Sequence, residues 1–174
     1  MNVRGARNQG EALAELCRCV KPPVNLERVA EKLGLRIACA ELGADVSGVL
    51  ISKGDSSDIL VEASHHPNRR RFTIAHEIGH FVLRHQFQPG EHVHVDRGHR
   101  ITLRNSRSST GEDAMEIEAN QFAAALLMPS KLIAAQIKKL GVTSPLDYHI
   151  TLLADQFEVS EQAMTIRLST LGYL

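Results

Sequence analysis

The spacing of apolar residues along this chain changes twice, and each change marks a different kind of secondary structure. Near both ends, apolar side chains recur every three or four positions, which is typical of amphipathic helices. Between residues 35 and 63, short apolar runs are separated by glycine and polar turns, which is typical of strands. Because the strands follow one another instead of alternating with helices, the pattern predicts an α+β fold.

Cap and turn residues set the expected limits of these elements. Pro22-Pro23 ends the first helix, while Asn25 and Gly34 cap the two ends of the second. Ser160 has the position of an N-cap for the last helix. We expect helices at 9–20, 26–33, 69–86, 112–128, 130–140, 145–157 and 160–171, and strands at 35–40, 46–52 and 58–63.

The length of 174 residues suits a single domain with one sizeable core. We expect the domain to cover residues 1–174, with a small sheet of about three strands packed on helices 69–86 and 112–128. Residues 144–174 form a helical C-terminal region that resembles a helix-turn-helix, and we expect it to pack on the core.

The segment 86–110 is polar and rich in His, Arg and Ser, and it leaves two interpretations open. In the first, 92–95 and 100–104 pair as a small hairpin. In the second, the segment is a surface loop. The sequence favours neither.

Charge and cysteine content limit the partners and the compartment. Twenty basic residues balance twenty acidic ones, so no net field attracts a polyanion, which disfavours direct nucleic-acid binding. No apolar run approaches the length of a membrane span, and the N-terminus lacks the apolar core of a signal peptide. The three cysteines form no CxxC pair, so we expect reduced thiols in a cytoplasmic protein without a membrane partner.

The pentapeptide His76-Glu77-Ile78-Gly79-His80 carries the strongest chemical signal. Two histidines four apart lie on one face of a helix, where both imidazoles can bind one metal ion. The glutamate between them can take a proton from a metal-bound water. Such a motif also arises by chance, with both histidines as ordinary helix residues, so a third ligand is needed to support a metal site.

Helix 112–128 offers that third ligand. Placed on a helical wheel, Glu116 and Asn120 lie at the edge of its apolar face, whereas Glu118 lies on the side expected to face solvent. A carboxylate on a buried face needs a compensating cation, so Glu116 is the predicted ligand. Asn120, one turn further on, can hydrogen-bond a ligand from the second layer around the metal. On its own helix His85 is expected to face away from both motif histidines.

Two histidines and one glutamate leave a fourth position open, which is typical of a catalytic zinc site. We expect one Zn2+ with a bound water as the nucleophile and Glu77 as the general base. Manganese and iron accept the same ligands, and a thiolate from Cys17 or Cys19 is a less favoured alternative ligand. The oxyanion-stabilising group stays open among nearby arginines and four other side chains. These are Tyr148, His149, His94 and His99.

With these motifs in place, the chain resembles the ImmA/IrrE family of metallopeptidases. The resemblance extends from about residue 20 to 172. It rests on Pro22 to Gly34, on Asn68 to His80, on Ser108-Ser109 and above all on Glu116 to Pro129. It implies that His76, His80 and Glu116 bind zinc and that Glu77 is catalytic.

The resemblance also implies a partner. Members of this family cut a helix-turn-helix transcriptional repressor encoded nearby, which derepresses genes of a mobile element, a phage, a stress response or a toxin–antitoxin-like pair. We therefore expect a zinc-dependent, site-specific endopeptidase with a protein substrate. The principal alternative is a DNA-binding transcriptional regulator that uses 152–172, although Arg167 is the only arginine its last helix offers. A metal-bearing module without turnover is disfavoured because Glu77 is present.

Two surfaces are candidates for holding the substrate. Arg69, Arg70 and Arg71 begin the metal helix and could contact an acidic segment, although such residues are usually solvated or paired internally. The strand pair within 46–63 directly precedes that helix, so the substrate could extend along an edge of the sheet.

Overall fold

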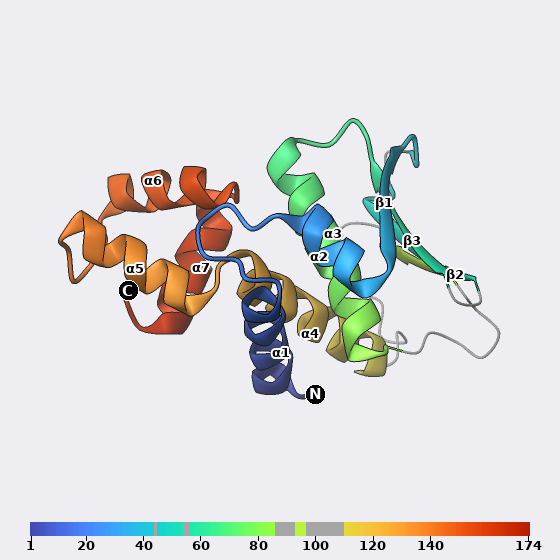
Figure 1. The fold of residues 1–174 in the computed structure, drawn as a ribbon, viewed down its shortest axis with the longest axis horizontal. Helices are drawn as coiled ribbons and strands as arrows, with labels where there is room; N and C mark the ends of the chain where they lie inside the picture. The colour runs from blue at the N-terminus through green and yellow to red at the C-terminus, as the bar shows by residue number, and fades with distance from the viewer. Residues whose placement is uncertain (44, 54–55, 86–92, 97–109) are drawn as a thin grey trace.

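The structure, a computed structural model, describes residues 1–43, 45–53, 56–85, 93–96 and 110–174. Helices and a small mixed sheet make up these ranges, so the predicted α+β class is confirmed (Figure 1). The helices are α1 (Val3–Leu16), α2 (Leu26–Leu33), α3 (Pro67–Leu83), α4 (Thr110–Leu127), α5 (Ser130–Leu140), α6 (Asp147–Phe157) and α7 (Glu161–Leu171). The strands are β1 (Leu35–Ala40), β2 (Gly48–Lys53), β3 (Ser56–Glu62) and β4 (Val93–Asp96).

The sheet has the strand order β1-β3-β2-β4. β1 runs parallel to β3, and β2 is antiparallel to both β3 and β4. β4 is the first arm of the hairpin that the sequence left open, but it pairs with β2, and the proposed second arm at 100–104 lies outside the described residues. β4 pairs with the outer side of β2, and β1 pairs with the outer side of β3. The strand pair within 46–63 therefore offers no free edge. The two edges among the described strands are β1 and β4.

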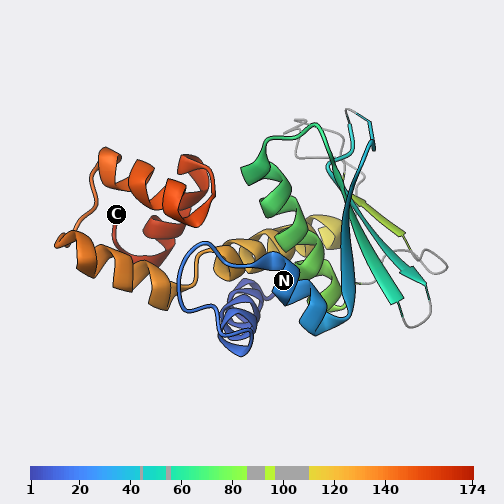
Figure 2. The ribbon, with the colours of Figure 1, turned by 45° about the horizontal axis from the view of Figure 1, so that its top comes forward.

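The elements form layers that run from the sheet to a group of helices at the opposite end (Figures 1 and 2). α3 packs against the sheet through β2 and β3, α4 packs against α3, and α1 packs along α4. The helices α5, α6 and α7 lie together at the end of the molecule away from the sheet (Figure 2). Within the described ranges, no helix is long and apolar enough to cross a lipid bilayer.

The first helix differs most from its predicted limits. The sequence predicts 9–20, whereas α1 covers Val3–Leu16. It begins early because the Asn2 side chain accepts a hydrogen bond from the Gly5 amide. It ends early because Arg18 adopts a left-handed conformation with φ of 53°, and the Cys19 amide bonds back to the Ala14 carbonyl. The turn thus closes before the proline pair is reached.

The metal-motif helix is also shifted from its predicted limits of 69–86. Pro67 occupies its first turn, where the missing amide hydrogen costs nothing, and the His66 ring accepts a hydrogen bond from the Asn68 amide. At the other end, Arg84 is left-handed with φ of 54° and stops the helix after Leu83.

Close backbone approaches fix how α4 lies between its neighbours. A Cβ atom on Gly79 would lie 3.2 Å from the Ala119 carbonyl oxygen, so α3 and α4 approach each other closely at this glycine. On another side of α4, a Cβ atom on Gly10 of α1 would lie 2.5 Å from the Phe122 carbonyl oxygen. The sequence predicts that the side of α4 carrying Glu118 faces solvent. In the structure α1 covers this side, and Ala125, which also lies on it, is fully buried.

We predict that Gly10→Ala destabilises the protein by about 1–3 kcal/mol, because the added methyl group must push against the backbone of α4. The gain in helix propensity, about 1 kcal/mol, offsets only part of this cost. Urea denaturation followed by circular dichroism measures the change in free energy of unfolding. Asn8→Ala, at an exposed position of the same helix, is the control. A Gly10→Ala protein at least as stable as the wild type would show that α1 and α4 do not pack this closely.

Glu62, the last residue of β3, organises the two loops that follow β1 and β3. Its carboxylate accepts hydrogen bonds from the amides of Leu42, Gly43 and Ser64 and from the Ser64 hydroxyl, at 2.6, 3.1, 2.9 and 2.7 Å. These four donors favour the ionised form and lower the pKa of Glu62 from 4.5 to about 2. The stabilisation is therefore complete above pH 4.5 and is lost as the pH falls towards 2.

We predict that Glu62→Gln destabilises the protein at pH 7 and that the difference from the wild type shrinks between pH 4.5 and pH 3. The glutamine offers one acceptor oxygen in place of two, and its amide nitrogen opposes the backbone donors. Free energies of unfolding from urea titrations at several pH values test this. Glu31→Gln, on the exposed face of α2, controls for the loss of one charge. A difference that did not depend on pH would contradict the prediction.

Candidate metal centre

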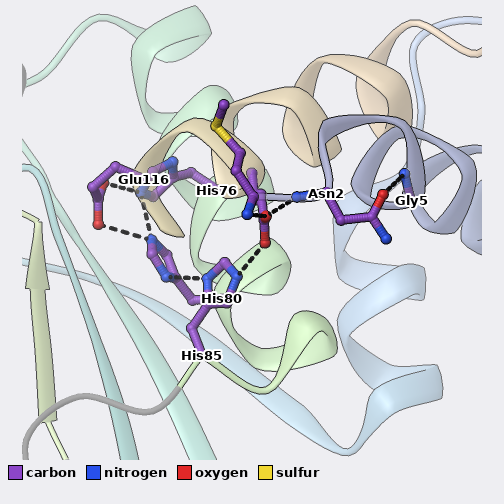
Figure 3. A network of polar contacts seen from close by, with 8 residues as sticks. Asn2, Gly5, His76, His80, His85 and Glu116 are labelled. Atoms are coloured by element: carbon purple, nitrogen blue, oxygen red, sulfur yellow. Dashed lines mark hydrogen bonds and ion pairs between the residues drawn. The ribbon is translucent and has the colours of Figure 1, made fainter. Parts of the chain in front are cut away.

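Three ligand-type groups converge between α3 and α4 (Figure 3). His76 and His80 come from one face of α3, and their Nε2 atoms lie 2.9 Å apart. Glu116 comes from α4 and places Oε2 at 3.2 Å from His76 Nε2 and Oε1 at 3.3 Å from His80 Nε2. Both rings are buried, whereas the Glu116 side chain is 28% exposed. The group therefore has one side open to incoming molecules.

The local sequence explains this convergence. Residues four apart on a helix lie one above the other, which brings the two imidazoles together on α3. Gly79 lies on the same turn of the helix and lets α4 approach closely at Ala119. Glu116 precedes Ala119 by three residues, and so it lies on the side of α4 that meets the histidines.

Asn120 fixes the proton of His76. Its Oδ1 atom lies 3.0 Å from His76 Nδ1, and an amide oxygen can only accept a hydrogen bond. His76 must then carry its proton on Nδ1, which leaves a lone pair on Nε2, the atom that faces His80 and Glu116. The structure thus brings the predicted second-layer residue into contact with the ring it was expected to orient.

A second chain of contacts fixes the proton of His80. Its Nδ1 lies 2.9 Å from His85 Nδ1, and His85 Nε2 lies 3.4 Å from Glu118 Oε2. The carboxylate accepts, so His85 is protonated on Nε2 and accepts from His80 through Nδ1. His80, like His76, therefore directs a lone pair on Nε2 into the group. The backbone N–H of Asn2, just before α1, donates to the other carboxylate oxygen of Glu118 (Figure 3).

The orientations expected for His85 and Glu118 were therefore wrong, and neither side chain is among the three converging groups. His85 was placed on a helix reaching residue 86, where it would face away, but α3 stops at Leu83 and the left-handed Arg84 folds His85 back towards His80. Glu118 was expected to face solvent, but α1 covers that side of α4 and leaves its side chain 18% exposed. The left-handed position that ends α3 is taken by Arg84 and not by a glycine, so no residue type in the sequence marks the helix end that brings His85 to His80.

The arrangement fits a divalent metal ion. Around a tetrahedral zinc ion with ligand bonds of 2.0–2.1 Å, ligand atoms are separated by about 3.3 Å. The three separations here are 2.9, 3.2 and 3.3 Å. Two imidazole lone pairs and a carboxylate at these distances repel one another unless a cation lies among them. These residues could therefore hold a metal ion and leave a fourth position for a reactant.

Glu77 is fully buried on the same turn of α3, beside the start of β2. A Cβ atom on Gly48 would lie 3.1 Å from Glu77 Oε1 and 2.4 Å from Thr73 Cγ2, so a larger residue here would have to displace these side chains. The first residue of β2 thus gives the Glu77 carboxyl group its room. This keeps an ionisable side chain in the interior next to the two histidines.

The structure assigns other roles to several side chains considered for substrate or oxyanion binding. His149 is buried, and its Nδ1 accepts a hydrogen bond from the Leu146 amide, which caps α6. Tyr148 is 61% exposed on α6. The side chain of His94 and all of His99 lie outside what the structure describes.

The three arginines at the start of α3 have internal partners. Arg69 donates to the Ser47 hydroxyl, Arg70 to the Ala63 carbonyl and Arg71 to the Val24 carbonyl, at 2.9, 2.8 and 2.8 Å. They hold the sheet and the preceding loops against α3. These contacts correspond to the alternative in which the three arginines are paired within the protein and do not contact an acidic substrate.

Arg167, the arginine considered for DNA contact, is 3% exposed. Its Nε donates to the Met128 carbonyl at 2.9 Å, and its guanidinium pairs with Glu11 of α1. Arg167 thus fastens α7 to α1 and to the end of α4 and does not lie on a surface that DNA could reach.

Comparison with known proteins agrees with this geometry. The family described as IrrE N-terminal-like domain, Peptidase_M78, matches residues 30–169. The radiation response metalloprotease IrrE of Deinococcus radiodurans is 34% identical over 103 residues, which are 59% of this chain and 27% of that protein. The matched segment is thus well under a third of the relative's length.

A solved structure, described as a Mycobacterium tuberculosis transcriptional regulator, resembles 97% of this chain and 47% of its own with a TM-score of 0.61. At 19% identity, this likeness concerns the fold alone. The family match covers most of the chain and includes α3 and α4, the two helices that carry the converging groups. The chain therefore belongs to the Peptidase_M78 family of IrrE-like metallopeptidases.

Proposed function

We propose that this chain is a zinc-dependent, site-specific endopeptidase that hydrolyses a peptide bond in a partner protein. The observation that carries the proposal is the convergence of His76, His80 and Glu116 at the spacing of a metal site with one open position. The histidine–histidine–glutamate set is typical of catalytic zinc and not of closed structural sites.

His76, His80 and Glu116 would hold the ion, each through one ligand atom. When bound, zinc lowers the pKa of a coordinated water to about 7 and polarises a substrate carbonyl. Asn120 and His85 keep the Nε2 lone pairs of the two histidines directed at the site, so no proton has to be displaced before the ion binds. The ligands are in this sense preorganised.

Glu77 is the proposed general base. As the residue after the first histidine it lies on the adjoining part of the helix surface, within the interior and beside Gly48. It takes the proton of the attacking water and then delivers that proton to the leaving amine. A single carboxyl group can serve both steps, because it accepts the proton as a carboxylate and donates it as a carboxylic acid.

We further propose that the partner is a helix-turn-helix transcriptional repressor encoded near this chain, as the family resemblance implies. The rival hypothesis, a DNA-binding regulator using 152–172, is disfavoured because Arg167 is buried and paired with Glu11. The chain's balanced charge points in the same direction.

We predict that the protein binds one zinc ion and that Glu116→Gln weakens zinc binding by more than about 100-fold, because a charged ligand is lost. Competition with a chromophoric chelator measures the affinity.

Glu77→Gln keeps zinc binding within a few-fold of the wild type but lowers cleavage of the co-expressed neighbouring repressor by about 10²–10⁴-fold. Zinc binding that survived Glu116→Gln unchanged, or undiminished cleavage by Glu77→Gln, would refute the respective assignment.

We also predict that His85→Phe and Glu118→Gln each weaken zinc binding by about 10–100-fold, although neither residue is a proposed ligand. The phenyl ring cannot accept from His80, and the neutral amide is a weaker acceptor for His85 than a carboxylate. Asp113→Asn, at an exposed position of α4, is the matched control. The same chelator competition applies, and unfolding of the metal-free proteins shows whether the fold is intact. Affinities within twofold of the control would rule out this positioning role.

A further inference from the structure

A groove leads away from the candidate metal centre between α3 and the pair α6–α7. It has a volume of about 850 Å³. His76 and Asn120 line one end, so the groove is continuous with the converging ligand groups. Its far wall is formed by the N-cap and the first turns of α7, through Ser160 to Ala163 and Ile166. Figure 2 shows α3 facing the group formed by α5, α6 and α7 across this part of the molecule.

Two polar contacts hold the walls of the groove at a set separation. The Asn68 side-chain amide donates to the Val159 carbonyl at 3.0 Å, and Arg71 Nε lies 3.3 Å from a Glu158 carboxylate oxygen. Both contacts join the start of α3 to the turn between α6 and α7. The groove is therefore a built feature of the fold, with its two walls joined by these contacts.

The two long walls present apolar side chains to each other. Phe72 lies one helical turn before His76 on α3 and is partly buried. On α7, Ala163 and Ile166 are three residues apart on one face, and Ile166 is 54% exposed. A single exposed isoleucine is ordinary on a protein surface. Ile166, however, lines a concave site next to a candidate metal centre. Concave sites with apolar walls are where apolar ligand groups bind.

Resting on the proposed peptidase function, we propose that this groove binds an extended segment of the substrate protein on one side of the bond to be cut. An apolar substrate side chain packs between Phe72 and Ile166. The stretch of α3 from Arg69 to His76 rises by about 10 Å, which matches about three extended residues. The groove would thus select the sequence next to the cleavage site.

The chemistry of the rim suits a peptide better than a polyanion. Asp155 and Glu161 line the α6–α7 side and Arg69 lines the α3 side, so the groove has no net positive charge that would attract phosphate groups. An extended backbone needs hydrogen-bond partners, and the exposed Gln162 and His66 side chains at the rim can supply them.

Peptide hydroxamates test the inference without needing turnover. A hydroxamate binds the zinc ion, and a tripeptide attached on its N-terminal or its C-terminal side extends the probe in either direction. In each series, leucine or lysine is moved through three positions of an otherwise alanine tripeptide. Dissociation constants for the zinc-loaded full chain are measured by calorimetry. Acetohydroxamate, which has no peptide extension, reports binding at the metal alone.

In one of the two series, leucine at one position should strengthen binding to the wild type about tenfold over alanine. Ile166→Glu should abolish this gain and favour lysine at the same position, because a carboxylate replaces the apolar contact. Leu152→Glu is the matched control, since Leu152 is an apolar α6 residue of similar exposure that does not line the groove. Both positions are exposed, so both variants should fold normally.

The outcomes separate the two proposals. If acetohydroxamate binds but the peptide series show no leucine preference, or if Ile166→Glu and Leu152→Glu behave alike, the groove is not the subsite while the metal centre stands. If acetohydroxamate does not bind the zinc-treated protein, the proposed function fails and the subsite fails with it. A leucine preference lost only in Ile166→Glu supports the groove.

Discussion

Three electron-pair donors, two of them buried, lie within hydrogen-bonding distance of one another in this protein, and much of the fold serves to hold them there. Two imidazole lone pairs and a carboxylate in a buried site repel one another and lose their hydration. A divalent cation removes both costs, and it would also stabilise the folded state, since the unfolded chain does not bring His76, His80 and Glu116 together. Metal binding and folding are therefore expected to be coupled.

Close helix packing supplies the geometry. Gly79 lets α3 and α4 approach until Glu116 reaches the histidines, and Gly10 lets α1 lie along another side of α4. That second contact places the start of α1 over Glu118. Glu118 hydrogen-bonds His85, and His85 in turn hydrogen-bonds His80 and orients its ring. An N-terminal helix far from the motif in sequence thus contributes to the arrangement of a ligand. The groove between α3 and α7 is continuous with the same centre and is the surface proposed to bind the substrate.

Local spacing was enough to predict much of this arrangement, and long-range packing accounts for what was missed. The four-residue spacing within α3 and the helix-ending Gly34 depend only on neighbouring residues, so they could be predicted from the sequence. His85 was misplaced because its position depends on one left-handed residue, Arg84. Glu118 was misjudged because only the packing of α1 shows that its side of α4 is covered. β4 was uncertain because its partner β2 lies some forty residues earlier in the chain.

X-ray absorption at the zinc edge of the zinc-loaded protein tests the central claim most directly, because it reports the atoms around the ion without requiring a substrate. We expect four nitrogen or oxygen neighbours at about 2.0–2.1 Å, with the outer-shell scattering of two imidazole rings. A sulfur neighbour at about 2.3 Å, which a thiolate such as Cys17 or Cys19 would give, or a spectrum without imidazole scattering, would contradict it.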